Sequence, residues 1–240
     1  MIDINLLSKK YGEQTVLDID LLNIPSGQTF GLVGNNGAGK TTLFSLILDL
    51  IEPTTGVVKN NEVVVSKDER WKTHTAAFVD EQFLIGYLTP EEYFYFVGGL
   101  RNMKKDAIKA ALEPYKDFFH GEVLGQKKYI RDLSKGNQKK VGIVGTLLSN
   151  TPLVILDEPF ANLDPTTQIR LKKLLKEEAS ATGKTFLISS HDLQHITDVC
   201  DRIVVLNKGK IVRDERTSSK TLKELEAFFQ EQPHFIYTKA

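Results

Sequence analysis

The nine residues from 34 to 42, GNNGAGKTT, have the types and the spacing of a phosphate-binding loop. They fit the pattern G-x-x-x-x-G-K-[ST]. Its fixed positions are Gly34, Gly39, Lys40 and Thr41. Glycines let a backbone curl so that successive N–H groups point at phosphate oxygens. A helix that begins at this loop would add the attraction of its positive end.

Each side chain of this loop has an expected role toward a nucleoside triphosphate and its magnesium ion. Lys40 is expected to reach the β- and γ-phosphates, and the hydroxyl of Thr41 is expected to ligate Mg²⁺. Thr42 is expected to be a further phosphate contact. The remaining loop residues expected at the phosphates are Asn35, Asn36, Gly37 and Ala38. An ordinary glycine-rich turn is the alternative, but the apolar run before the loop and the helical pattern after it favour a phosphate site.

A second chemical group lies at residues 153–158, LVILDE, where an apolar run ends in two carboxylates. The carboxyl ends of parallel strands are where α/β proteins place ligand-contacting groups. We predict that Asp157 holds Mg²⁺ through water and that Glu158 acts as the general base on the attacking water. An isolated Asp-Glu pair is more typical of a solvated strand end, so this prediction depends on the phosphate loop that precedes it.

The elements that would position these residues alternate between strands and helices. Short apolar runs predict strands at 30–33, 76–79, 153–156, 185–188 and 203–206. Three of them, at 30–33, 153–156 and 185–188, show little period-2 alternation, as expected of parallel strands that are covered on both faces. Helical patterns follow at 40–50, 165–182 and 192–200. This rhythm predicts an α/β fold with a mostly parallel sheet.

Two regions depart from the rhythm. Residues 1–27 and 56–65 predict antiparallel β-structure, the second with a tight turn at Asn60-Asn61. Residues 89–149 predict helices only, and Thr89 with Glu92 forms a capping-box pattern at the start of the first. We therefore expect an N-terminal β subdomain and an inserted helical subdomain. Residues 220–231 predict an amphipathic closing helix.

Residues 133–140, LSKGNQKK, resemble the Leu-Ser-Gly-Gly-Gln signature of the ATP-binding cassette (ABC) ATPases. Leu133, Ser134 and Gly136 match this signature, whereas Lys135 and Asn137 depart from it. The lysine at the third position resembles export-type cassettes. A helix expected at 137–149 would make this segment a second anion-binding helix start.

The resemblance extends over nearly the whole chain and implies further site residues. Tyr11 matches the aromatic residue that stacks on adenine, Asp164 matches the acid of the D-loop, and His191 matches the switch histidine that senses the γ-phosphate. The family has a glutamine that contacts Mg²⁺ between its core and its helical insert. Spacing places Glu81 there and residue type favours Gln82, so both stay open, with a slight preference for Glu81.

The resemblance also implies an organisation and a mechanism. Residues 1–82 and 150–215 would form the ATPase core with its β subdomain, 83–149 the helical insert, and 216–240 the closing helix and tail. Two ATP molecules with Mg²⁺ would be held between two cassettes, as a homodimer or with a second cassette, and Ser134, Gly136 and Asp164 would act on the partner's nucleotide. The resemblance implies coupling to a separate transmembrane permease on the cytoplasmic face of the inner or plasma membrane.

The composition fits this expectation and bounds the alternatives. Lys and Arg total 31, as do Asp and Glu, so overall charge gives no reason to expect a nucleic acid partner. The single cysteine excludes an intrachain disulfide, and the first residues lack the apolar core of a signal peptide. The most apolar stretch, 43–51, is far shorter than the roughly 20 residues of a membrane helix. We therefore expect a soluble protein.

Two other functions remain as alternatives at this point. One is an ABC-type ATPase that acts on ribosomes or DNA, although members of that kind usually carry two cassettes or a long coiled coil. The other is a zinc metalloprotease, because HDLQH at 191–195 echoes the H-E-x-x-H pattern. Its acid is aspartate, and the other three histidines are scattered along the chain.

Overall fold

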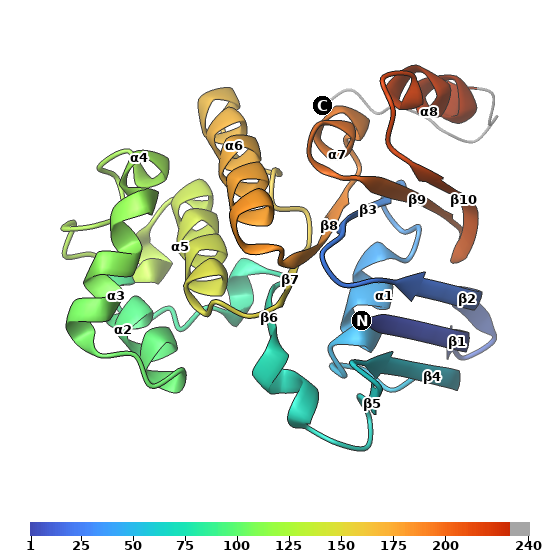
Figure 1. The fold of residues 1–240 in the computed structure, drawn as a ribbon, viewed down its shortest axis with the longest axis horizontal. Coiled ribbons are helices and arrows are strands. Elements are labelled where there is room, and N and C mark those ends of the chain that lie inside the picture. The colour runs from blue at the N-terminus through green and yellow to red at the C-terminus, as the bar shows by residue number, and fades with distance from the viewer. Residues whose placement is uncertain (231–240) are drawn as a thin grey trace.

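The computed structural model describes residues 1–230, which form two β-sheets and a group of helices (Figure 1). The first sheet has four strands in the order β2-β1-β4-β5, and each neighbouring pair is antiparallel. Its strands are β1 (Ile2–Tyr11), β2 (Gln14–Ile24), β4 (Thr55–Asn60) and β5 (Val63–Val64). Gly12, with φ of 56°, forms the turn of the β1–β2 hairpin, a conformation that favours glycine.

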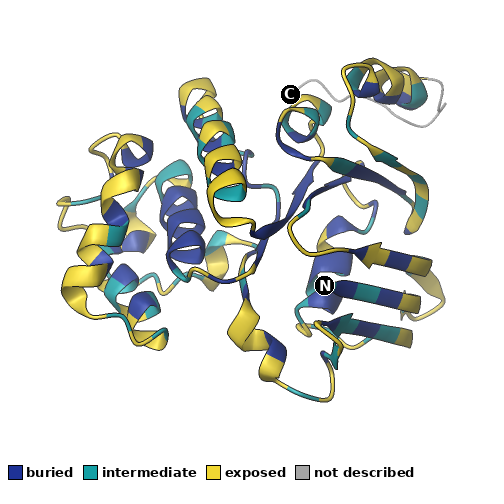
Figure 2. Ribbon diagram, in the orientation of Figure 1, coloured by how far each residue is buried: buried dark blue, intermediate teal, exposed yellow. Residues whose placement is uncertain are grey.

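The second sheet has six strands in the order β10-β9-β3-β8-β7-β6, and only β10 runs antiparallel to its neighbour. Its strands are β3 (Thr29–Val33), β6 (Thr75–Phe78), β7 (Leu153–Leu156), β8 (Thr185–Ser190), β9 (Arg202–Asn207) and β10 (Lys210–Arg216). Every residue of β3, β7 and β8 is buried (Figure 2). Burial on both faces explains why these strands show no apolar–polar alternation in the sequence.

Two hydrophobic clusters form on the two faces of the parallel sheet. Phe186 and Ile188 of β8 contribute to one cluster, while Leu187 between them contributes to the other. The helices α6 (Pro165–Thr182), α7 (Leu193–Val199) and α8 (Thr221–Gln230) pack in the first cluster. The helix α1 (Lys40–Ile47) packs in the second, between the parallel sheet and the antiparallel sheet. This arrangement fixes the start of α1 at the carboxyl end of β3, where the parallel strands of the sheet end.

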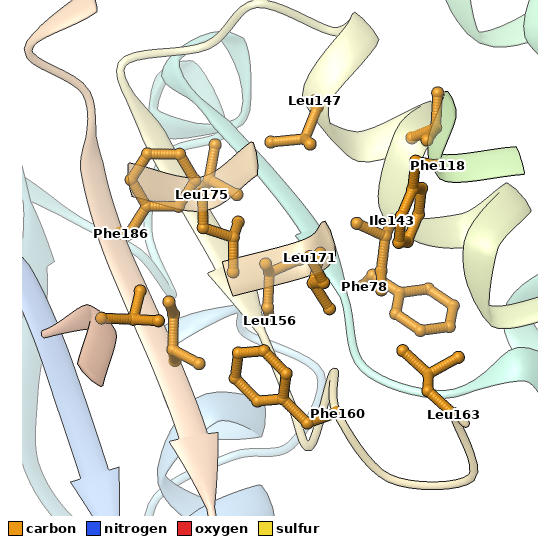
Figure 3. Packing of buried hydrophobic residues seen from close by; sticks show 14 of the residues in the cluster. Phe78, Phe118, Ile143, Leu147, Leu156, Phe160, Leu163, Leu171, Leu175 and Phe186 are labelled. Atoms are coloured by element: carbon orange, nitrogen blue, oxygen red, sulfur yellow. The ribbon is translucent and has the colours of Figure 1, made fainter. Parts of the chain in front are cut away.

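The segment between β6 and β7 is helical. It contains α2 (Pro90–Leu100), α3 (Lys105–Leu112), α4 (Lys116–Phe119) and α5 (Lys135–Leu148), with short 3-10 turns such as η2 (Glu81–Phe83). Unlike α2 and α3, α5 is buried over nearly its whole length (Figure 2). Ile143 of α5 lies near Phe78 and Phe118 in the close view of the core (Figure 3). Thus α5 connects the helical segment to the parallel sheet.

The close packing of α5 explains two of its glycines. A Cβ atom at Gly142 would lie 2.1 Å from the ring of Phe78, and one at Gly145 would lie 2.6 Å from the ring of Tyr93. Such distances leave no room for a side chain. The sheet and α2 therefore approach the backbone of α5 directly at these two positions.

The expected fold class is confirmed: an α/β fold with a mostly parallel sheet, an N-terminal antiparallel sheet and a helical segment inserted between strands. Several expected boundaries were wrong. The turn after β4 is centred on Asn61 and Glu62, both with positive φ, one residue later than expected. The helix expected at 137–149 begins at Lys135 because Ser134 is its N-cap. The strand β10 was not expected. The closing helix is α8, and residue 231 lies outside the described residues.

Candidate functional site

The loop between β3 and α1 has the backbone that the glycine pattern requires. Gly39 is the N-cap of α1, with φ of 107°, which a residue with a side chain adopts only under strain. A Cβ atom at Gly34 would lie 2.4 Å from the carbonyl oxygen of Leu206, and one at Gly39 would lie 2.9 Å from that of Val16. The loop is therefore enclosed by β9 and by β2, while its tip at residues 35–37 is exposed.

Lys40 lies beneath this loop and is almost completely buried. Its Nζ donates a hydrogen bond to the carbonyl oxygen of Gly34 at 2.6 Å and lies 3.1 Å from Oε1 of Glu158. A buried ammonium is stable only when it is paired and hydrogen-bonded. The lysine is therefore held between the phosphate loop and the carboxylate that follows β7.

A hydroxyl and a carboxylate meet beside the start of α1. Thr41 Oγ1 donates to Oδ2 of Asp157 at 2.6 Å, and the hydroxyl of Ser189 donates to Oδ1 of the same carboxylate. Burial raises the pKa of Asp157 above its ordinary value, although the two hydroxyl hydrogen bonds act in the opposite direction. Both Thr41 and Asp157 offer hard oxygen atoms of the kind that Mg²⁺ prefers. The residues present therefore fit a magnesium ion shared with phosphates.

Glu158 adopts a left-handed backbone conformation, with φ of 46°. Its Oε2 lies 2.9 Å from Nδ1 of His191, and its backbone N–H donates to Ser189 Oγ at 2.8 Å. Burial acts to raise the pKa of Glu158, but the His191 hydrogen bond and the Lys40 charge outweigh it, so that the pKa lies below its ordinary value. The same hydrogen bond raises the pKa of His191. Glu158 is therefore an ionised carboxylate oriented by two basic side chains.

The structure distinguishes the two candidates in the linking segment after β6. Glu81 is largely buried, and its Oε1 lies 3.4 Å from Nζ of Lys139. Gln82 is exposed, and its backbone N–H donates to Oδ1 of Asp80 at 2.7 Å. Both residues line the cleft beside Asp157 and Glu158, but Glu81 is the one whose side chain is largely buried and paired. Lys139, whose Nζ also donates to the carbonyl oxygen of Glu158 at 2.9 Å, was not anticipated from the sequence.

Several of these groups line one cleft of about 570 Å³, although Lys40 and His191 do not. Its lining includes the predicted site residues Thr41, Glu81, Gln82, Asp157 and Glu158. They come from α1, from the segment after β6 and from the turn after β7, three elements that meet at the carboxyl edge of the parallel sheet (Figure 1). Ser189 at the end of β8 is a further contributor that the sequence did not indicate, because an isolated serine carries no pattern.

Other predicted residues do not line this cleft. Tyr11 ends β1 and is 55% exposed, with Lys9 Nζ 4.8 Å from the centre of its ring. Ser134 accepts a hydrogen bond from the N–H of Asn137 at 3.2 Å and so caps α5. Asp164 caps α6, accepting hydrogen bonds from both the N–H and the hydroxyl of Thr167. Within one chain Ser134 and Asp164 cap their own helices, and Gly136 lies half-buried in the first turn of α5.

The two histidines of the HDLQH segment face different partners. His191 contacts Glu158, whereas the ring of His195 lies 4.6 Å from that of Phe160, between centroids. Burial lowers the pKa of His195. Among residues 1–230 there is no cluster of three or more His, Cys, Asp or Glu side chains arranged to hold a metal ion. The structure therefore gives no support to a zinc protease site.

Comparisons with known proteins agree with this geometry. The sequence pattern of the family described as ABC transporter matches residues 17–161. An uncharacterised ABC transporter ATP-binding protein of Methanocaldococcus jannaschii is 35% identical over 88% of this chain and 76% of its own length. The bacitracin transport ATP-binding protein of Enterococcus faecalis is 31% identical over 91% of this chain and 70% of its own length.

Two solved structures share the fold. One is an ATP-binding subunit of an ABC transporter, with a TM-score of 0.80 and 27% identity over 95% of this chain and 93% of the other. The second is a dimeric bacterial ABC transporter cassette, with a TM-score of 0.80 and 28% identity over 91% of this chain and all of the other. With the phosphate loop and the adjoining carboxylates in place, these matches show that the chain belongs to the ABC transporter family.

Proposed function

We propose that the chain binds ATP with Mg²⁺ and hydrolyses it to power a transporter whose membrane part is a separate permease. The observation that carries this proposal is the convergence of Lys40, the Thr41–Asp157 pair and Glu158 at one edge of the sheet. In residues 1–230, none of the helices has the length and apolar character needed to cross a bilayer. In this proposal a partner carries out transport and this chain works on the cytoplasmic face of the membrane, as the relatives named as ATP-binding proteins of transporters suggest.

The side chains of the cleft suggest how hydrolysis proceeds. Lys40 pairs with Glu158, and the β- and γ-phosphates of ATP would compete for its charge. Once Lys40 turns to the phosphates, Glu158 is free to accept a proton from the attacking water, while His191 holds its other oxygen. Thr41 and Asp157 would hold Mg²⁺, which when bound neutralises the developing negative charge. Positioning and electrostatics thus account for most of the catalysis.

We propose that a second cassette completes the site. Ser134 begins the 14-residue helix α5, whose first N–H groups and positive end attract anions. Ser134 and Asp164 lie outside the cleft of their own chain, so they are available to a nucleotide that is held by another chain. The dimeric cassette among the similar structures supports this arrangement. The partner is a second copy of this chain or another cassette, and Tyr11 would stack on the adenine of the nucleotide.

The permease contact is proposed at a second, more apolar cleft of about 340 Å³ next to the first. It is lined by Leu48, Trp71, Phe83, Leu84 and Tyr93, among others. Phe83 is 63% exposed and belongs to the same segment as Glu81. Motion at the nucleotide would therefore reach this surface through the linking segment, and residues 83–149 would move with it as a unit.

We propose that the transporter exports its substrate, and the support for this direction is Lys135 in the signature segment. Among the relatives, one is named for bacitracin transport and one, from Saccharolobus solfataricus, for glucose import. None of the reported relatives is named for action on ribosomes or DNA.

Co-expression with candidate permeases tests the proposal directly. The purified chain should hydrolyse ATP, and a permease should co-purify with it. Replacing Leu84 with Asp should release the permease while leaving ATP hydrolysis by the isolated chain within about twofold, because Leu84 lines the second cleft and not the cleft of the reacting groups. A chain that does not hydrolyse ATP, alone or with permeases, would refute the proposal.

A further inference from the structure

The cleft next to the phosphate loop has an unusual balance of charge. Its lining includes the carboxylates of Asp80, Glu81, Asp157 and Glu158, but a single lysine, Lys139. Carboxylates that share a small cavity repel one another, and a polyphosphate adds further negative charge. The ammonium of Lys40, which does not line the cleft, pairs with the carboxylate of Glu158. Lys139 is therefore the basic side chain that lies beside Glu81 in this cleft.

Lys139 joins three elements that converge on the site. It projects from the second turn of α5, and its side chain is only 6% exposed. Its Nζ lies 3.4 Å from Glu81 in the linking segment and donates to the carbonyl oxygen of Glu158 after β7 at 2.9 Å. The Glu81 Oε1 atom is buried and has no hydrogen bond from any described residue. Lys139 is therefore the cation that this carboxylate faces.

The second contact acts on the residue proposed as the general base. Glu158 has a left-handed backbone, a conformation that persists in a residue with a side chain only where its surroundings hold it. Its N–H donates to Ser189, and its carbonyl oxygen accepts hydrogen bonds from Lys139 and, at 3.2 Å, from the N–H of Ala161. Lys139 therefore contributes the one side-chain donor among the hydrogen bonds that fix the peptide groups of Glu158.

We propose that Lys139 is a positioning residue for ATP hydrolysis: it holds the carbonyl group of Glu158 and pairs with Glu81, and so keeps the general base directed at the attacking water. This inference rests on the proposed function of the same cleft. It assigns a role in this reaction to a lysine that lies one turn inside α5 and does not need to touch the nucleotide.

A purely structural role is the alternative, and the chain offers a matched pair for comparison. Lys184 Nζ lies 2.9 Å from Glu178, with side chains 7% and 20% exposed, close to the 6% and 12% of Lys139 and Glu81. Lys184 precedes β8, at the opposite end of that strand from Ser189. Breaking this pair leaves a buried charge unpaired just as breaking the first does, but far from the catalytic carboxylates.

The experiment compares Lys139→Gln with Lys184→Gln, measuring kcat and KM for ATP and the melting temperature without nucleotide. Both variants should lose thermal stability. Lys139→Gln should lower kcat by about 30-fold or more with KM changed by less than about threefold, because it disturbs the base and not the binding of the nucleotide. Lys184→Gln should keep kcat within about twofold.

Two further variants separate charge from packing. Glu81→Gln added to Lys139→Gln should recover about tenfold of the lost kcat, because no unpaired carboxylate then remains. Lys139→Arg keeps the charge and the donors and should keep kcat within about fivefold of the parent chain. If Lys139→Gln does not fold, the comparison of Lys139→Arg with the parent chain replaces it as the test.

The outcomes divide cleanly. A kcat for Lys139→Gln that matches that of Lys184→Gln, or a double variant no faster than Lys139→Gln, overturns the inference while leaving the proposed function intact. If the parent chain itself shows no ATP hydrolysis, the proposed function fails first. Calorimetric binding of magnesium-ADP to Lys139→Gln, expected to stay within about threefold of the parent, gives a readout that does not depend on turnover.

Discussion

The phosphate side of the site and the start of α5 differ in what their polar groups contact. On the phosphate side, Lys40, Asp157 and Glu158 contact one another or their immediate neighbours across three strands of the sheet. At the start of α5, Ser134 caps its own helix, and nearby Asp164 caps α6. The first side is built within one chain. The second is the start of a helix, and we propose that it contacts a nucleotide only when another chain binds there.

The largest effect should come from Glu158, which the phosphate side holds most tightly. Glu158→Gln removes the proton acceptor while keeping the shape of the side chain, so hydrolysis should fall by about 10²–10⁴-fold. Binding of ATP should remain, because Lys40 and the loop are untouched. Steady-state hydrolysis with calorimetry measures both quantities. Parent-like turnover in this variant would contradict the role of Glu158.

Lys40 should have the next largest effect, and on binding. Lys40→Ala removes the buried ammonium from beneath the loop, so ATP affinity should weaken by about 100-fold, as for the loss of a charge-assisted contact to phosphate. Lys184→Ala, which removes another buried lysine, is the control and should leave affinity unchanged. Equal affinities for the parent and Lys40→Ala in calorimetry would show that the phosphates bind elsewhere.

Ser134 tests the other region. Ser134→Arg places a long side chain at the start of α5 and should lower hydrolysis by about tenfold or more without weakening ATP binding to the monomer. Loss of the cap itself costs about 1 kcal/mol. Thr89→Arg is the control, because Thr89 caps α2 in a capping box and should cost similar stability without a loss of hydrolysis. Similar rates for the two variants would mean that the start of α5 has only a structural role.

The smallest effect concerns pH and the His191–Glu158 contact. The pKa of His191 is raised by Glu158, so its contribution to stability is full below the unfolded value of about 6.5 and is lost as pH rises through the folded value. Since the pKa of Glu158 is lowered, the contribution of Glu158 to stability is lost only when the pH falls through that pKa, in acid. His191→Ala should therefore cost more stability at pH 6 than at pH 9 in urea unfolding. A cost that is independent of pH would show that the charged contact does not form.

The sequence signals of the phosphate side are local. Gly34 and Gly39 belong to one nine-residue motif, although the backbone oxygens that exclude a side chain there come from β9 and β2, and the carboxylates at 157 and 158 follow a buried strand directly. The contributions of Ser189 and Lys139 depend on strand order and on the burial of α5, which bring distant segments together. A single serine or lysine carries no such information, so neither could be identified from the sequence.

The choice between Glu81 and Gln82 stayed open because the two sequence signals conflict: spacing favours Glu81, whereas residue type favours Gln82. In the structure, the turn η2 directs Glu81 toward Lys139 and leaves Gln82 exposed. Lys139 comes from a distant helix, so the sequence alone could not reveal this difference.

The most direct test of the account is the association state of Glu158→Gln with and without magnesium-ATP, followed by sedimentation velocity. Because this variant should hold ATP without cleaving it, we predict a monomer alone and a dimer with ATP, and a monomer in both conditions when Ser134→Arg is added. A chain that saturates with ATP by calorimetry and yet stays monomeric at concentrations of tens of micromolar would contradict the proposal that two cassettes share each nucleotide.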